Sequence, residues 1–185
     1  MFIILTERRG VEMIKTITEL GVFACGELSV EEINFYGEIR KICESNGCRV
    51  YDKTWVCPPA IGTVEECKNR VLSFKKALLF NAVYQLEDSF DIEGMDDARI
   101  EFKKLCEKIH SAVLKDHPDH IILANGGCQI CEKCTYPDSP CRFPDIAFQA
   151  LEGYGVNVSE LAKLAGIKYI NGKDTVTYFA MILYN

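Results

Sequence analysis

The amino-acid sequence predicts an α/β or α+β fold in which a small mixed β-sheet is flanked by helices. Two short apolar segments, residues 77–84 and 121–124, have the length and composition of buried strands. The stretch between them carries apolar residues at helical spacing. Near the C-terminus, Asn171-Gly172 separates two further apolar segments, a pattern typical of a β-hairpin. Alternating strands and helices with a final antiparallel hairpin indicate this class.

The N-terminal third is expected to contain an edge strand and two helices. Residues 2–5 are short and apolar, as in an edge strand, and residues 11–20 repeat apolar positions every three residues, as in an amphipathic helix. Ser29 and Glu32 form a capping-box pattern, which predicts a helix that continues to Cys43.

The central region is expected to be mainly helical around the strand at 77–84. Thr63 and Glu66 repeat the capping-box pattern and predict the start of another helix. The clearest helical periodicity covers residues 96–115 and ends at His117-Pro118. The strand at 121–124 then leads directly into a cysteine-rich loop. Beyond that loop, the sequence predicts short helices over 144–151 and 158–165 and a hairpin that pairs 167–170 with 175–184.

Length and charge narrow the class of protein. A chain of 185 residues is long enough for one domain with its own core, so residues 1–185 are interpreted as a single metal-binding domain. The net charge of −6 and the scattered basic residues disfavour nucleic-acid binding. The start is too short for a signal peptide, and no apolar run is long enough to span a membrane. We therefore expect a cytoplasmic protein without a membrane partner.

The expected role of the ten cysteines depends on the compartment of the protein. In a secreted protein they would suggest disulfides. A reducing cytoplasm and closely spaced cysteines favour metal or redox chemistry instead.

Four of the cysteines lie within one short loop, at positions 128, 131, 134 and 141. The run CxxCxxC, followed by a fourth cysteine close to prolines, is typical of a loop that wraps thiolates around a [4Fe–4S] cluster. Gly126 and Gly127 would allow the backbone to approach such a cluster. Four thiolates also suit tetrahedral Zn²⁺, although zinc sites are more often built from two separate CxxC pairs. The predicted ligands are Cys128, Cys131, Cys134 and Cys141.

A second set consists of Cys43, Cys48 and Cys57, the last of which is followed by two prolines. This set is one thiolate short of four. Cys25 or Cys67 is a candidate for the fourth ligand, or an iron keeps an open position for substrate. The alternative is three buried, inert thiols.

Other candidate ligands fit structural roles better. Cys106 lies on the apolar side of the helix at 96–115 and is predicted to belong to the core. His110, His117 and His120 lack the i, i+4 spacing of a helical metal site, so solvated or capping roles are expected. Trp55 suits either the shielding of a cluster from water or ordinary core. Nucleotide-binding and nucleophile motifs are absent from the sequence.

The two cysteine-rich stretches resemble a bacterial and archaeal family of predicted metal-binding proteins, a domain of unknown function common in anaerobes. The resemblance rests on CxxxxC with Tyr51, Trp55 and Cys-Pro-Pro, and on the segment 126–144 with its four cysteines and Pro-Cys-Arg-Phe-Pro. It implies that Cys43, Cys48, Cys57 and the four loop cysteines are family features, whereas Cys25, Cys67 and Cys106 are extras. It also implies that Arg142 balances cluster charge and that Tyr136 packs over the loop.

Three functions follow from these patterns. A cluster with four thiolate ligands has no vacant iron, so one-electron transfer to or from a redox protein partner is the first interpretation, with a second cluster as a relay. A three-cysteine site with an open iron would instead make the protein an enzyme. The third interpretation is an interaction module stabilised by zinc. The sequence predicts neither the oligomeric state nor the redox partner.

Overall fold

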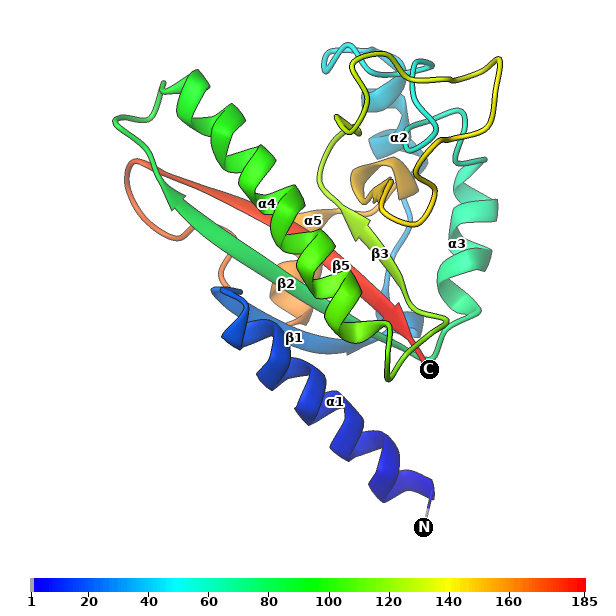
Figure 1. Ribbon diagram of the computed structural model, residues 1–185, viewed down its shortest axis with the longest axis vertical. Coiled ribbons are helices and arrows are strands. Elements are labelled where there is room, and N and C mark those ends of the chain that lie inside the picture. The colour runs from blue at the N-terminus through cyan, green and yellow to red at the C-terminus, as the bar shows by residue number, and fades with distance from the viewer. Residues whose placement is uncertain (1) are drawn as a thin grey trace.

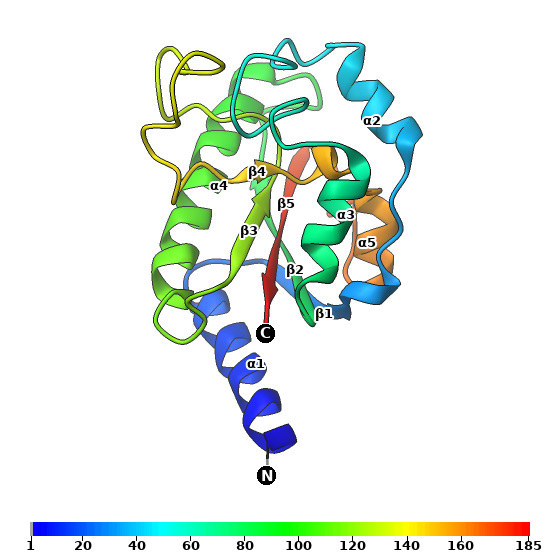
Figure 2. The same ribbon diagram turned by 90° about the vertical axis from the view of Figure 1, so that its right-hand side faces the viewer.

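A computed structural model describes the backbone from Phe2 to Asn185 and the side chains from Gly10 onward. The chain forms a mixed sheet with helices on both sides (Figures 1 and 2). In chain order the elements are α1 (Phe2–Glu19), β1 (Ala24–Ser29), η1 (Val30–Glu32), α2 (Gly37–Glu44), α3 (Val64–Leu72), β2 (Lys76–Gln85), α4 (Ile92–Val113), β3 (Ile121–Ala124), β4 (Gln149–Ala150), η2 (Glu152–Tyr154), α5 (Val158–Leu164) and β5 (Thr175–Tyr184).

The sheet has the strand order β1-β2-β5-β3-β4. The two longest strands, β2 and β5, pair antiparallel along their full length, from Lys76 opposite Tyr184 to Gln85 opposite Thr175. β1 and β3 also pair antiparallel with their neighbours in the centre, whereas β3 and β4 run parallel. The sheet is therefore mixed, as the sequence predicts.

Alternating side chains of the central strands supply two hydrophobic cores. Leu78 and Phe80 of β2 pack with Phe102 of α4 and with residues of α1 on one face. Leu79 points to the opposite face, where it packs with Leu161 of α5 and with residues of α3. Because successive side chains of a strand alternate between faces, one apolar strand serves both layers. Figure 2 shows the sheet between α4 and the pair α3 and α5.

Most of the predicted elements are confirmed. The predicted helices at 11–20, 63 onward, 96–115 and 158–165 correspond to α1, α3, α4 and α5, and the two predicted core strands correspond to β2 and β3. In α3, the Thr63 hydroxyl accepts the Glu66 N–H at 3.2 Å while the Glu66 carboxylate accepts the Thr63 N–H at 2.7 Å. This reciprocal pair is the predicted capping box.

Four local predictions are wrong. Residues 2–5 belong to α1, because an isolated edge strand has no partner there whereas the helix continues through them. Ser29 and Glu32 do form a capping box, but it caps the short η1, and α2 starts separately at Gly37. The segment 144–151 contains no helix and supplies β4.

The predicted C-terminal hairpin is also absent. Residues 167–170 form no strand, and β5 lies between β2 and β3 instead. Gly172 has a φ of 140°, which favours glycine, but the turn before β5 lies at residues 173–174. Pairing with the long strand β2 satisfies more backbone groups of β5 than a four-residue partner would. Among the described helices, none is both long enough and apolar enough to cross a lipid bilayer.

Candidate metal centre

The two cysteine-rich segments lie side by side at one end of the sheet. The first follows α2 and runs to the start of α3, and the second follows β3 (Figures 1 and 2). Because β3 ends at Ala124, a strand of the rigid core delivers the chain to Cys128. We call residues 43–59 the first cysteine loop and residues 126–144 the second cysteine loop.

Aromatic side chains connect the two loops. The indole Nε1–H of Trp55 donates a hydrogen bond to the carbonyl oxygen of Ser139 at 3.0 Å. The Trp55 ring packs edge-on against Tyr136, with 4.9 Å between ring centroids. The Tyr136 hydroxyl in turn donates to the Asp52 carboxylate at 2.9 Å. Trp55 is therefore a connection between the loops and not ordinary core, and Tyr136 packs at this junction.

A close backbone approach joins the loops at a second place. A Cβ atom on Gly127 would lie 3.2 Å from Cγ2 of Val50, so a larger residue at this position would require Val50 to shift. Cys57 and Cys128 belong to one hydrophobic cluster there, together with Val56. Gly127 therefore makes room for the first loop, and the expected approach of its backbone to a cluster stays a prediction.

The four cysteines of the second loop line one small cavity. Its other lining residues include Trp55 and Val56 of the first loop and Arg142 of the second loop. The Arg142 guanidinium also donates to the carbonyl oxygen of Lys133 at 3.1 Å, which holds a positive charge at this cavity. The cavity gathers the following thiols: Cys128, Cys131, Cys134 and Cys141.

Burial governs the protonation of Cys128. Removal from water raises the pKa of this thiol, while the nearby backbone N–H of Ile130 and the charge of Lys103 partly offset that effect. Backbone N–H groups directed at cysteine sulfurs also stabilise iron–sulfur clusters. A metal that displaces the thiol proton would remove the burial penalty and would benefit from the same N–H. This loop therefore supplies the four thiols that a tetrathiolate centre needs, although the described side chains are not arranged as a ready-made metal site.

The first loop brings its three cysteines into one neighbourhood. Cys43 lies on α2, Cys48 is exposed and Cys57 is buried. Burial is the main factor that raises the pKa of both Cys43 and Cys57, and the nearby Cys48 raises both further. Arg40 partly offsets the effect on Cys43. Within the part of the chain that the structure describes, no group of three His, Cys, Asp or Glu side chains forms a ready-made metal site. The ligand roles of both sets are consequently proposals.

Unusual backbone geometry marks the first loop. Three of its non-glycine residues, Asn46, Arg49 and Asp52, have positive φ values of 56°, 62° and 56°. The Asn46 side-chain carbonyl accepts the backbone N–H of Tyr51 at 3.1 Å and supports this conformation. Asn and Asp adopt this left-handed conformation more readily than other non-glycine residues, so the strain is concentrated at Arg49. This geometry favours a site over a passive connection between helices.

The extra cysteines occupy core positions. Cys67 is fully buried in the cluster beside α3, where its thiol lies 3.5 Å from a guanidinium nitrogen of Arg40 and 3.5 Å from the carbonyl oxygen of Ile61. Cys25 of β1 packs against the opposite core. Cys106 is buried in that core, as predicted, and burial raises its pKa to about 12. Cys25 and Cys67, the two candidates for a fourth ligand of the first set, are therefore both packed in the hydrophobic cores.

Lys103 and Glu152 were missed by the sequence patterns. The charge of Lys103 acts on Cys57 of the first loop and on Cys128 of the second, and burial lowers its pKa. The Glu152 carboxylate accepts the backbone N–H of Gly126 at 3.3 Å and interacts with the charges of Lys103 and Cys43. Nothing in the periodicity of α4 distinguishes Lys103 from other surface lysines, so only the fold identifies it.

The three histidines form a separate cluster. His117 and His120 are buried, so the expectation of solvated roles is wrong for them. Nδ1 of His110 lies 3.0 Å from Nε2 of His120, and Nδ1 of His120 lies 2.6 Å from the carbonyl oxygen of His117. The latter contact lies in the segment that follows α4, so it does not cap that helix. Burial lowers the pKa of His120.

These features define a class: an α+β protein whose paired cysteine loops can present thiolates to metal. A family model described as "Predicted metal-binding protein (DUF2284)" matches residues 26–184. The chain belongs to this family, which confirms the resemblance noted from the cysteine motifs. No curated protein and no solved structure matches the chain significantly.

Proposed function

We propose that the second cysteine loop holds a [4Fe–4S] cluster that transfers single electrons to or from a protein partner. The observation that carries this proposal is the shared cavity lined by all four of its cysteines. Four thiolates saturate the irons of a cubane cluster, so the cluster would supply a one-electron redox couple and no vacant site for substrate. The proposed ligands are Cys128, Cys131, Cys134 and Cys141.

The surroundings of this cavity support electron transfer over a purely structural metal. Arg142 lines the cavity and Lys103 acts on Cys128, so positive charge is available to balance a negatively charged cluster. Trp55 forms part of the wall and limits the access of water. Ile130 and Phe143, which also line the cavity, are 37% and 43% exposed, so an electron would leave close to the surface.

The first loop would hold the second centre. Cys57 and Cys128 share one hydrophobic cluster, and Lys103 acts on both. Two adjacent centres would allow an electron to enter through one loop and leave through the other. We include a reducing cytoplasm in this proposal, because thiolates that lose their metal in an oxidising compartment form disulfides.

Electron paramagnetic resonance of the anaerobically purified, dithionite-reduced protein tests this function. We expect a cluster signal in the wild-type protein that is lost or strongly altered in Cys128→Ser. Cys106→Ser is the matched control, since Cys106 is a buried core cysteine remote from both loops in sequence. A signal that survives Cys128→Ser unchanged would show that the chosen ligands are wrong.

A second candidate function is catalysis at the first loop. Cys25 and Cys67 are engaged in the two cores, so the three thiols Cys43, Cys48 and Cys57 have no evident fourth cysteine. An iron with an open position would be able to bind and polarise a substrate. Cyanide, added to the reduced protein, would then perturb a spectrum that Cys57→Ser removes. A spectrum insensitive to cyanide would leave electron transfer as the function.

Zinc is the remaining alternative for the same ligands. Four thiolates would bind Zn²⁺ tetrahedrally and the metal would contribute folding energy without redox chemistry. Zinc would survive aerobic purification, whereas a [4Fe–4S] cluster would lose iron and its characteristic absorbance in air. Metal analysis before and after exposure to air distinguishes these two cases.

A further inference from the structure

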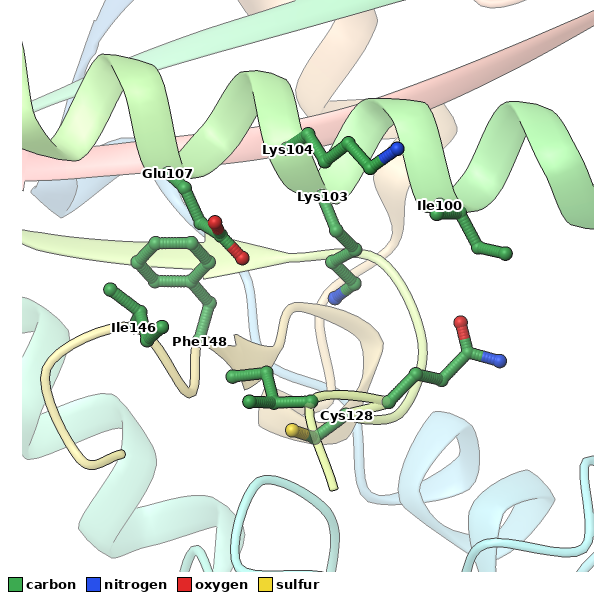
Figure 3. A pocket seen from close by; sticks show the side chains of 9 residues that line it. Ile100, Lys103, Lys104, Glu107, Cys128, Ile146 and Phe148 are labelled. Carbon is green, nitrogen blue, oxygen red and sulfur yellow. The ribbon is translucent and has the colours of Figure 1, made fainter. Parts of the chain in front are cut away.

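A larger cavity lies between α4 and the beginning of the second cysteine loop. Its volume is about 400 Å³, which falls in the range of about 300–1,000 Å³ for small-molecule sites. It is distinct from the small cavity of the four cysteines, and Cys128 and Ile130 line both. Figure 3 shows α4 along one side of this cavity and the segment that carries Cys128 along the other.

The walls of this cavity are mainly apolar. Ile100 from α4, Ile130 from the second loop, and Ile146 and Phe148 from the segment before β4 all line it. Phe148 is held in place by an edge-on contact with the His110 ring, with 5.8 Å between centroids. An apolar portion of a ligand would therefore find a preformed surface.

Three charged side chains of α4 interrupt the apolar lining: Lys103, Lys104 and Glu107. Lys103 and Glu107 lie four residues apart on α4, so both side chains project from the same face of the helix. In Figure 3 the Lys103 amine points toward the segment of Cys128, and the Glu107 carboxylate lies near the Phe148 ring. No ion pair involves Lys103 or Glu107 among the described residues. Lys104, which also lines the cavity, has its charge balanced by an ion pair with Glu101 at 2.7 Å.

The charges of Lys103 and Glu107 determine which ligand charges the cavity favours. A simple carboxylic acid would pair with Lys103 but would be repelled by Glu107, and a simple amine would meet the reverse problem. A molecule that carries both charges would satisfy both side chains. Because these interactions occur in a partly desolvated cavity, each is stronger than it would be in open water.

We propose that this cavity binds a small zwitterion with an apolar side chain, in the chemical class of the apolar α-amino acids. The Lys103 ammonium would receive the carboxylate and the Glu107 carboxylate would receive the amino group. The apolar side chain would pack against Ile146 and Phe148. The position of the ligand beside a cluster rests on the proposed function, through Cys128.

Isothermal titration calorimetry under anaerobic conditions, on the protein purified with its metal, tests the proposal. The probes are L-leucine and L-phenylalanine, together with 4-methylpentanoate, which lacks the amino group of leucine, and 3-methylbutylamine, which lacks its carboxylate. We expect at least one amino acid to bind, and the leucine analogues to bind about tenfold or more weakly than leucine, because each loses one charge-assisted contact.

Two substitutions test the charge of Lys103 and the charge of Glu107 one at a time. Lys103→Met and Glu107→Gln should each weaken amino-acid binding by about tenfold to a hundredfold. Glu107→Gln should also improve the binding of 4-methylpentanoate, because the repulsion of its carboxylate is removed. Lys108→Met is the matched control, since Lys108 is exposed on the same helix and does not line the cavity. Circular dichroism and urea midpoints would verify that each variant is folded.

The proposal would be overturned if neither amino acid binds at millimolar concentration. It would also be overturned if the two leucine analogues bind as tightly as leucine, or if Lys103→Met leaves the affinities unchanged. Iron and sulfide analysis of the same samples keeps the two proposals apart: a sample without a cluster refutes the proposed function, while calorimetry still decides the cavity. A shift of the cluster signal on addition of the bound amino acid supports its position beside Cys128, and no shift contradicts it.

Discussion

The contact between Gly127 and Val50 predicts a specific coupling between the two cysteine loops. A Cβ atom at Gly127 would lie 3.2, 3.3 and 3.4 Å from Cγ2, Cγ1 and Cβ of Val50. These separations are too short for relaxed packing, and overpacking of this kind costs about 1–3 kcal/mol. Val50 is only partly buried and can yield slightly, so we expect Gly127→Ala to lower the free energy of unfolding by about 1 kcal/mol.

The same substitution should be harmless once the clash is removed. Val50→Ala deletes both Cγ atoms, so in that background Gly127→Ala should have no cost. It should even stabilise the protein slightly, because alanine loses about 0.4–1 kcal/mol less backbone entropy on folding. The coupling free energy from the double-mutant cycle should therefore be about 1–2 kcal/mol.

Urea unfolding of the four proteins in the presence of reductant measures this coupling. Gly126→Ala is the control, because Gly126 has a φ of 60° and open space around it. Its cost of about 1–2 kcal/mol comes from the backbone alone and should be the same with Val50 or Ala at position 50. If Gly127→Ala costs equally much in both backgrounds, the loops do not interlock at this contact.

Three further predictions concern single side chains. Trp55→Phe removes the hydrogen bond to Ser139 and should lower the free energy of unfolding by about 0.5–1.5 kcal/mol, with faster amide exchange in both loops. Burial raises the pKa of Cys106 to about 12, so this thiol keeps its proton in the folded state, whereas the thiol of the unfolded chain ionises above about pH 9. The free energy of unfolding should therefore fall as the pH rises, by up to about 1.4 kcal/mol per pH unit. Cys106→Ala should reduce this slope in urea titrations at pH 9–11, and an unchanged slope would assign the loss to other groups. Thr63→Ala, which removes the cap of Glu66, should cost about 1 kcal/mol in the same urea assay, and no change would mean that the capping box contributes nothing.

Local sequence signals account for the elements that were predicted correctly. The capping box at Thr63 and the apolar periodicity of α4 act within a few residues, so the sequence alone reveals them. The prediction of a C-terminal hairpin is wrong because β5 pairs with strands that are distant in the sequence. Local patterns do not show which of the possible partners is preferred. β2 pairs with β5 along the full length of both strands, whereas the shorter segment 167–170 could pair with only part of β5.

The candidate site likewise combines features that local sequence patterns reveal with features that only the fold reveals. The spacing of the four cysteines from Cys128 to Cys141 is local and is visible in the sequence, and in the structure all four line one small cavity. Their role as ligands stays a prediction. The proximity of Cys57 to Cys128 depends on Gly127 and Trp55, whose contacts cross from one loop to the other. No pattern along the chain encodes such contacts. Lys103 was missed for the same reason, since it gains its place only when the loops pack on α4.

The iron and acid-labile sulfide content of the anaerobically purified protein tests the central claim most directly. A cluster held by Cys128, Cys131, Cys134 and Cys141 predicts about four irons and four sulfides per chain, and about eight of each if the first loop holds a second cluster. Stoichiometric zinc without acid-labile sulfide would contradict the claim.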